Sequence, residues 1–271
     1  FYNIVVATGS YADRVFEFVS ALNIPFLYER SFKLMHESVL NERFLLSLYL
    51  PALNGTERQM LQDLASVFNM PEVYRKAIDA QIVGLRELHI GFEQQEKASV
   101  CKVYIENPLP ASLPVSGGES QLIHSAYKWS ITTPQSMAID SYHLIPVTSR
   151  EEILERAARL TGDSDAPGFE AVKQLFLLDQ GSLALEDLFY LEVADEAKMR
   201  SSFDLKFYDA ELTMEQVQPI IYSAANYFSV PVAAIDQLLA TEKHKTLGHL
   251  SSGTGRNGQA FVTFYYGVQA M

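Results

Sequence analysis

Two short segments of the chain place a lysine and a tyrosine at alternate positions, at residues 102–104 (Lys-Val-Tyr) and 206–208 (Lys-Phe-Tyr). Side chains of a β-strand alternate between its two faces, so the ammonium and the phenol share one face and the apolar residue takes the other. If the apolar face packs under helices, the Lys/Tyr face lines a polar interior. Cations beside aromatic rings suit a ligand with an anionic end and a planar or carbocation-like end.

A surface position for these residues is the competing interpretation. A lysine or tyrosine on a strand is commonly half-exposed, with its stem packed along the sheet. Because the pair occurs twice at the same spacing, both interpretations stay open, and the enclosed site is the hypothesis that the structure can test.

The chain around these segments repeats one unit, a strand pair around a polar turn followed by an amphipathic helix. Alternation and turn residues predict strands at residues 43–50, 87–93, 100–106, 124–132, 136–146, 246–253 and 259–268, with a further pair inside 188–212. Helical spacing predicts helices at residues 56–68, 149–160, 169–178 and 213–228. Residues 107–120, rich in Pro, Gly and Ser, predict a loop, either a surface connection or a lid.

The order of these elements predicts an α+β fold built on antiparallel strands. Strands joined by a hairpin are antiparallel, whereas single strands alternating with crossover helices would build a parallel sheet. Repeated hairpin-helix units can close into one antiparallel β-barrel with the helices outside, which removes exposed sheet edges. About ten strands would leave an interior wide enough for a ligand. We expect residues 1–271 to form a single barrel domain, with an open α+β sheet as the alternative.

The composition argues against several classes of function. A formal net charge of -12 and a pI near 4.9 disfavour sequence-independent binding to nucleic acid or to an anionic membrane. The single cysteine, Cys101, lies in an apolar segment and fits a reducing compartment. The opening residues lack the basic region of a signal peptide, and no apolar run reaches about 18 residues. We therefore expect a cytoplasmic protein that binds neither nucleic acid nor membrane.

Two further patterns give no metal or nucleotide site. Residues 253–258 match the glycine spacing of a dinucleotide-binding loop, but they lie between two predicted strands and are better interpreted as a hairpin turn. The six histidines show no ligand-pair spacing on one helix, and one cysteine allows no zinc pattern. The chain also lacks the adjacent aspartates that bind magnesium diphosphate in isoprenyl chain-elongating enzymes. We predict no metal site, although a loosely held Mg²⁺ stays compatible with the sequence.

Taken together, the Lys-x-Tyr strands, the hairpin-helix order and the terminal FVTFYYGV resemble the aromatic prenyltransferases of the ABBA barrel type, which include indole and cyanobacterial peptide prenyltransferases. The resemblance runs from about Glu37 to Val268 as short motifs, of which KVYIENP after a hairpin is the most specific. It implies a barrel that binds an allylic diphosphate, dimethylallyl or geranyl, through Arg and Lys. It also implies that tyrosines shield a carbocation and that an acidic residue orients or deprotonates an aromatic small molecule or peptide acceptor.

Residue by residue, the resemblance implies roles for nine positions in this chain. The substrate-binding residues would be Arg43, Lys102, Lys128, Tyr142 and Lys206. The catalytic residues would be the tyrosine shield, Tyr104, Tyr208 and Tyr265, and the acceptor-binding carboxylate, Glu37. Ionising an allylic diphosphate separates pyrophosphate from an allyl cation, so fixed cations must receive the negative charge while tyrosine faces stabilise the allyl group. Two alternatives stay open, a solvent-facing Glu37 and an Arg43 that forms a salt bridge with Glu42 or Glu37.

One strand departs from the family pattern. Indole prenyltransferases typically carry Arg and Lys ahead of the tyrosine of their third unit, whereas residues 137–142 read MAIDSY and keep only Tyr142. Lys128 on the neighbouring strand could replace the missing cations, or the diphosphate is held more weakly. A ligand-binding barrel without turnover and an α+β protein-interaction domain are therefore the alternatives to a prenyltransferase.

Overall fold

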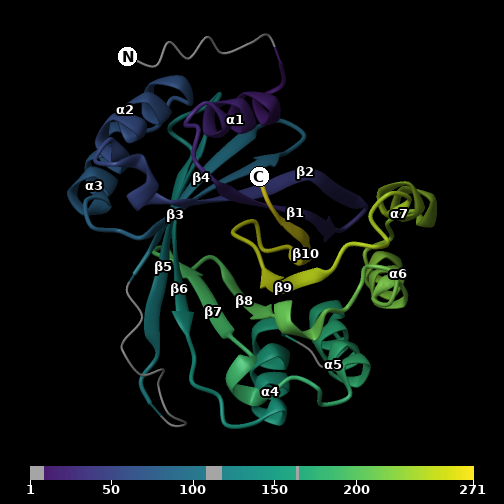
Figure 1. The fold of residues 1–271 in the computed structure, drawn as a ribbon. Helices are drawn as coiled ribbons and strands as arrows, with labels where there is room; N and C mark the ends of the chain where they lie inside the picture. The colour runs from purple at the N-terminus through teal and green to yellow at the C-terminus, as the bar shows by residue number, and fades with distance from the viewer. Residues whose placement is uncertain (1–8, 108–117, 163–164) are drawn as a thin grey trace.

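The computed structural model describes residues 9–107, 118–162 and 165–271, and its strands close into an antiparallel barrel (Figure 1). The strands of the described residues are β1 (Phe26–Met35), β2 (Ser38–Tyr49), β3 (Glu87–Gln94), β4 (Ser99–Glu106), β5 (Gln121–Ser130), β6 (Met137–Leu144), β7 (Tyr190–Asp195), β8 (Ser201–Lys206), β9 (Leu247–Thr254) and β10 (Ala260–Ala270). Each strand pairs with its neighbours in sequence, and β10 closes the barrel against β1. The predicted closed antiparallel barrel is confirmed, and the open-sheet alternative is wrong.

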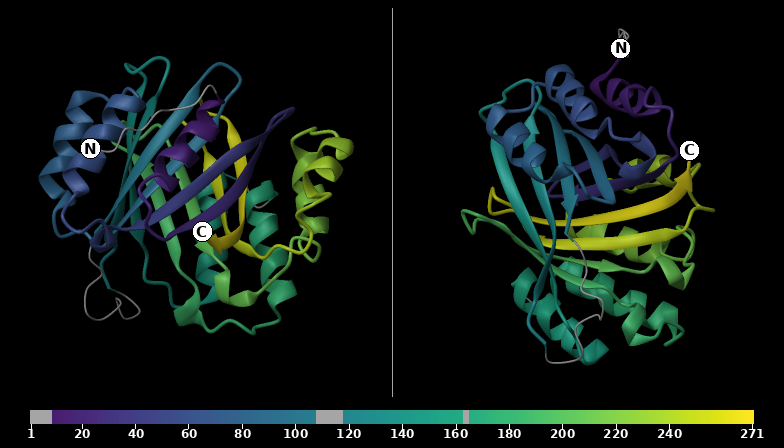
Figure 2. Two further views of the ribbon diagram at one scale, coloured as in Figure 1. Left: turned by 45° about the horizontal axis from the view of Figure 1, so that its top comes forward. Right: turned by 60° about the vertical axis from the view of Figure 1, so that its left-hand side comes forward.

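Helices cover the outer face of the barrel (Figure 1). The helices of the described residues are α1 (Tyr11–Ser20), α2 (Glu57–Val67), α3 (Glu72–Ile82), α4 (Arg150–Thr161), α5 (Pro167–Asp179), α6 (Gln218–Tyr227) and α7 (Val232–Leu239). Figure 2 shows α1–α3 and α4–α7 on different sides of the barrel. None of these helices is long and apolar enough to cross a membrane.

Two apolar cores lie between the barrel and these helix groups. Val103 and Trp129 belong to the core that packs against α1–α3, and the indole N–H of Trp129 donates to the Phe68 carbonyl at 2.8 Å. Phe207 and Phe264 belong to the core that packs against α4–α7. Burial of these outward-facing residues under amphipathic helices leaves the opposite strand faces, with their polar side chains, to the barrel interior.

Local sequence signals explain several element boundaries. The Ser149 hydroxyl accepts the backbone N–H of Glu152 at 3.1 Å and caps α4, and Gly162 ends that helix with a φ of 84°. Between β9 and β10, the Gly255 N–H donates to the Gln259 carbonyl at 2.9 Å and Gly258 has a φ of 75°. The glycine-rich segment at residues 253–258 is therefore a hairpin turn, as predicted.

The sequence pattern does not predict β1, and it also misses α1, α3 and α7. The inward face of β1 carries Glu29, Ser31 and Lys33, and the polar Arg30 between them leaves this segment without a clear apolar and polar alternation in the sequence. Helix α6 begins five residues later than expected, at Gln218. Most of the predicted loop at residues 107–120 lies outside the described residues.

Candidate functional site

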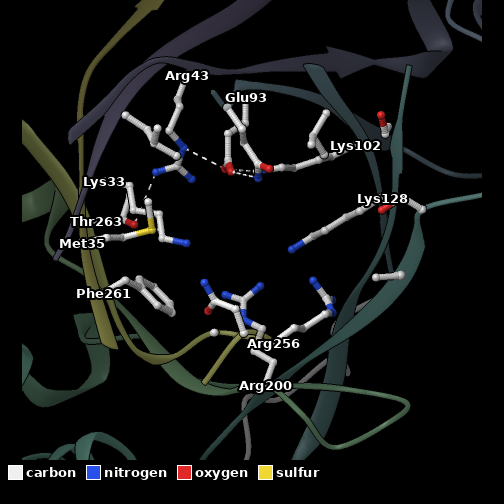
Figure 3. A pocket seen from close by; sticks show the side chains of 18 of the residues that line it. Lys33, Met35, Arg43, Glu93, Lys102, Lys128, Arg200, Arg256, Phe261 and Thr263 are labelled. Carbon is white, nitrogen blue, oxygen red and sulfur yellow. Dashed lines mark hydrogen bonds and ion pairs between the residues drawn. The ribbon is translucent and has the colours of Figure 1, made fainter. Parts of the chain in front are cut away.

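A cavity of about 700 Å³ occupies the end of the barrel where the hairpins turn (Figure 3). Turn residues such as Glu96 and Asn257 contribute to its mouth, and the tyrosines Tyr104, Tyr142 and Tyr265 line its deeper part. A volume of this size accommodates a small organic ligand.

Cationic side chains dominate the walls of this cavity (Figure 3). The cation cluster consists of Lys33, Arg43, Lys102, Lys128, Arg200 and Arg256. The family resemblance implies Arg43, Lys102 and Lys128 as substrate-binding residues, and all three line the cavity; it gives no role to Lys33, Arg200 and Arg256, which line the cavity as well. Arg200 directly precedes β8 and Arg256 lies in the β9–β10 turn, so neither belongs to a strand with an alternating pattern. A cationic residue beside a hairpin turn was the only signal that could have drawn attention to these two arginines.

Glu93 on β3 organises one half of the cation cluster. Its Oε2 lies 3.0 Å from Arg43 Nε and 2.8 Å from Lys102 Nζ, and all three residues are buried. Arg43 Nη1 also donates to the Thr263 hydroxyl at 3.4 Å. Burial by itself would raise the pKa of Glu93, but the charges of Lys102 and Arg43 hold this pKa well below its usual range. Arg43 therefore forms a salt bridge with Glu93, and not with Glu42 or Glu37, and both residues of the pair line the cavity.

Asp140 on β6 organises the other half. Its carboxylate is fully buried and forms ion pairs with Lys128, Arg200 and Arg256. Asp195 on β7 lies 2.9 Å from Arg256 Nε and accepts the backbone N–H of Arg200 at 3.0 Å, which fixes the turn that carries this arginine. The strand that lacks the family's cations thus supplies a carboxylate, and the cations come from neighbouring strands and turns.

Tyrosine rings lie directly behind the cations. Tyr104 and Tyr142 pack edge to face with ring centroids 5.7 Å apart, and Lys128 Nζ lies 6.0 and 5.8 Å from these two rings. The guanidinium of Arg43 lies 5.8 Å from the ring of Tyr265. Burial raises the pKa of all three tyrosines, so their hydroxyls stay protonated and can donate hydrogen bonds.

Acidic residues and an imidazole lie beyond Tyr265. His249 Nδ1 lies 2.7 Å from Asp204 Oδ1, and its Nε2 lies 3.3 Å from Glu29 Oε2. Glu29 is buried and also accepts the Tyr208 hydroxyl at 2.9 Å. Burial would lower the pKa of His249, but the charges of Asp204 and Glu29 raise it to about 9. The ring is therefore an imidazolium at neutral pH.

Two further histidines on the inward faces of β3 and β5 stay neutral. His89 Nδ1 lies 2.7 Å from the Ser47 hydroxyl, and its ring centroid lies 6.4 Å from that of Tyr104 and 5.7 Å from that of His124. Burial, followed by the charge of Lys206, lowers the pKa of His89 to about 4. Burial, followed by His89, lowers the pKa of His124 to about 3.

Glu37, the predicted acceptor-binding carboxylate, lies away from this interior. It occupies the exposed β1–β2 turn with a φ of 52°, and its backbone N–H donates to the Phe228 carbonyl at 2.7 Å. It does not line the cavity. The alternation of β1 points Glu29 inward instead, so the interior carboxylate on this hairpin is Glu29.

Lys206 and Tyr208, to which the resemblance gives substrate-binding and catalytic roles, do not line the cavity that Lys102 and Tyr104 line. Lys206 pairs with His249 across β8 and β9, and its ammonium lies 5.5 Å from the Phe189 ring. Tyr208 follows the strand in a short 3₁₀ turn and is 39% exposed. The two Lys-x-Tyr segments therefore belong to different levels of the barrel.

Comparison with solved structures places this barrel among known ones. 5-dimethylallyltryptophan synthase from Streptomyces coelicolor has a TM-score of 0.58 and 15% identity, covering 88% of this chain and 80% of its own. The prenyltransferase PriB, in a ternary complex with L-tryptophan and dimethylallyl thiolodiphosphate, has a TM-score of 0.57 and 15% identity, covering 97% and 92%. The fold is that of the ABBA-type aromatic prenyltransferases.

The same barrel occurs in AnaPT from Neosartorya fischeri, with a TM-score of 0.52 and 12% identity, covering 88% of this chain and 77% of its own. No protein-family model and no curated protein sequence matches the sequence of this chain. Within the described residues, no group of three or more His, Cys, Asp or Glu side chains is placed to hold a metal ion.

Proposed function

We propose that this chain transfers a prenyl group from an allylic diphosphate, dimethylallyl or geranyl, to an aromatic acceptor inside the barrel. The observation that carries this proposal is the order of the interior layers, with cations at the hairpin end, tyrosine rings behind them, and carboxylates and imidazoles beyond. This order matches the arrangement of the two substrates. The diphosphate of the donor would lie against the cations, its allyl carbons against the tyrosine rings, and the acceptor beyond them.

The cation cluster provides a net positive charge for the leaving group. Its six basic side chains face three buried carboxylates, Glu93, Asp140 and Asp195. When the bond between the allylic carbon and the diphosphate oxygen breaks, the electron pair stays with pyrophosphate, and fixed cations stabilise the developing charge. The electron-rich faces of Tyr104, Tyr142 and Tyr265 stabilise the allyl cation and exclude water from it.

The residues beyond the tyrosines suit an aromatic acceptor. Glu29 can accept a hydrogen bond from an indole N–H or a phenol O–H, which raises the nucleophilicity of the ring. Attack on the allyl cation forms the new bond and leaves a strongly acidic arenium ion. Neutral His89 beside Tyr104 can take the released proton, because its low pKa keeps the imidazole unprotonated. Two neighbours were solved with tryptophan together with DMASPP or dimethylallyl thiolodiphosphate, which supports this acceptor class, and an aromatic side chain of a peptide fits the same chemistry.

Asp140 favours a second candidate, a barrel that binds an anionic ligand without turnover. This carboxylate already neutralises part of the charge that Lys128, Arg200 and Arg256 would offer a diphosphate. A weaker grip on the leaving group would slow ionisation more than it would weaken ground-state binding.

One assay separates the two candidates. The protein is incubated with dimethylallyl or geranyl diphosphate and a panel of tryptophan, other indoles, phenols and aromatic peptides, and products are detected by mass spectrometry. The Lys102→Ala protein serves as the control for a diphosphate-dependent product. A prenylated product from wild type that is strongly reduced in the control supports the proposal. If pyrophosphate stabilises the wild-type protein but no acceptor gives a product, the result supports the binding barrel. If wild type gives no product and pyrophosphate does not stabilise it, both candidates are contradicted.

A further inference from the structure

Lys33 differs from the other members of the cation cluster in its surroundings. It lies on the inward face of β1, and its ammonium points into the cavity from the wall opposite Lys128 (Figure 3). Of the six cations in the cluster, Lys33 alone forms no ion pair or hydrogen bond with the described residues. Its ammonium instead lies over the ring of Phe261 on β10, with Nζ 4.3 Å from the ring centroid.

The charges that face Lys33 come from several strands. Arg43 on the paired strand β2, Lys102 on β4 and Arg200 beside β8 are cations, whereas the other paired strand, β10, presents Phe261 and the neutral Thr263. Glu93 on β3 is the carboxylate that faces Lys33, and its oxygens are engaged by Arg43 and Lys102.

This environment disfavours the ammonium form. Burial is the main reason why the pKa of Lys33 is lowered to about 7, Glu93 opposes the shift, and Arg43 and Arg200 add to it. In the empty barrel near neutral pH, Lys33 is therefore divided between amine and ammonium. Loss of its charge also reduces repulsion within the cluster.

We propose that Lys33 is a further ligand of the diphosphate, and that it takes up a proton from solvent when this anion binds and returns it when pyrophosphate leaves. The inference rests on the proposed function, because it needs an anion in this cavity. A diphosphate held by the cluster supplies the counter-charge that Lys33 lacks, so the ammonium form becomes the favoured one.

The sign of the pH dependence follows from linkage. Below about pH 7, Lys33 is protonated with and without the anion, so binding takes up no proton at this residue. Above about pH 7, the complex holds a proton that the free protein lacks. The affinity for the anion then falls with rising pH, by up to about tenfold per pH unit, until the pKa of the complex is reached.

Two matched variants isolate this proton. Lys33→Arg keeps a cation that does not titrate in this range, and Lys33→Met keeps the length of the side chain without charge. Binding of dimethylallyl thiolodiphosphate to each protein is measured by calorimetry in buffers of different ionisation enthalpy, at about pH 6 and about pH 8. The ligand's own titration is common to all three proteins and cancels in the comparison. Circular dichroism confirms that both variants are folded.

At about pH 8, we expect wild type to take up close to one proton more than Lys33→Arg, and at about pH 6 we expect no difference. Lys33→Arg should also bind more tightly than wild type at about pH 8. If wild type binds the anion but takes up no more protons than the two variants, the role of Lys33 is overturned and the diphosphate site stays intact. Failure of wild type to bind the anion at low ionic strength would overturn the diphosphate site and, with it, this role.

Discussion

His249 and Tyr265 stack face to face inside the barrel, with ring centroids 3.7 Å apart and an interplanar angle of 13°. His249 lies on β9 and is held by Asp204 and Glu29, whereas Tyr265 lies on β10 beside the cation cluster. The stack therefore fixes the plane of Tyr265 at the boundary between the cationic end and the acidic residues. A carbocation held against this tyrosine would have a defined distance from Glu29.

The charge of His249 should make stability depend on pH. Its pKa is about 9 in the folded protein and about 6.5 in an unfolded chain, so the folded state binds more protons between these values. The stabilisation is fully present below about pH 6.5 and is lost as pH rises through about 9. Urea denaturation across this range should show the advantage of wild type over His249→Gln shrinking by a few kcal/mol. Parallel curves for the two proteins would show that His249 is neutral in the folded state.

Replacing Arg43 by lysine should separate turnover from affinity. Lysine keeps the charge beside Glu93 but cannot present paired N–H donors to a phosphate. If Arg43 receives charge from the leaving pyrophosphate, kcat should fall by about 10- to 1000-fold, with a smaller loss of diphosphate affinity. Steady-state kinetics and calorimetry on the folded variant measure the two effects. Unchanged turnover would leave Arg43 with a structural role only.

Asp140→Asn should lower stability and strengthen the response to anions. The change leaves Lys128, Arg200 and Arg256 with one buried counter-charge fewer, which costs about 3–5 kcal/mol. Pyrophosphate could supply the missing charge, so it should raise the melting temperature of the variant more than that of wild type. An equal or smaller rise in the variant would mean that the anion does not reach these three cations.

Glu29 and Glu37 provide a direct test of which carboxylate serves the acceptor. Glu29→Gln removes the buried charge between His249 and Tyr208 and should lower kcat by about 100-fold, the scale of one general acid-base contact. Glu37→Gln changes an exposed turn residue and should leave kcat within about twofold. Product formation measured on both variants decides the assignment, and the reverse order would return the role to Glu37.

Lys33→Met should be more stable than wild type in acid and lose this advantage in base. The folded pKa of Lys33 is about 7 and the unfolded value is about 10.4, so the unfolded state binds more protons between these values. Wild-type stability therefore gains on the variant as pH rises from about 7 toward about 10. Thermal unfolding of both proteins at matched ionic strength measures the difference. A constant difference across this range would show that Lys33 has an ordinary pKa.

Much of the fold follows from local patterns in the sequence. Val103 between Lys102 and Tyr104, and Phe207 between Lys206 and Tyr208, predicted which strand faces pack under helices, and both residues lie in the outer cores. Hairpin turns such as residues 253–258 fixed the antiparallel pairing. These features could be predicted because alternation and turn chemistry act over a few residues.

The membership of the cavity could not be predicted in this way. Arg200 and Arg256 reach Asp140 from 60 and 116 residues away along the chain, and neither belongs to a strand pattern. Their common position depends on the closure of β6, β7, β8 and β9 into one barrel wall.

The height of each inward-facing residue along the barrel axis was likewise decided by the tertiary structure. The sequence determined that each of Lys102 and Lys206 shares one strand face with a tyrosine, and it left open whether that face lines an interior. The pairing of β8 with β9 placed Lys206 beside His249, and the position of β1 in the closed barrel placed Glu29 in the interior and left Glu37 in the exposed β1–β2 turn. The physical reason is that alternation fixes the face of a strand, whereas the height of a residue in a barrel depends on bulges and on the stagger between strands distant in sequence.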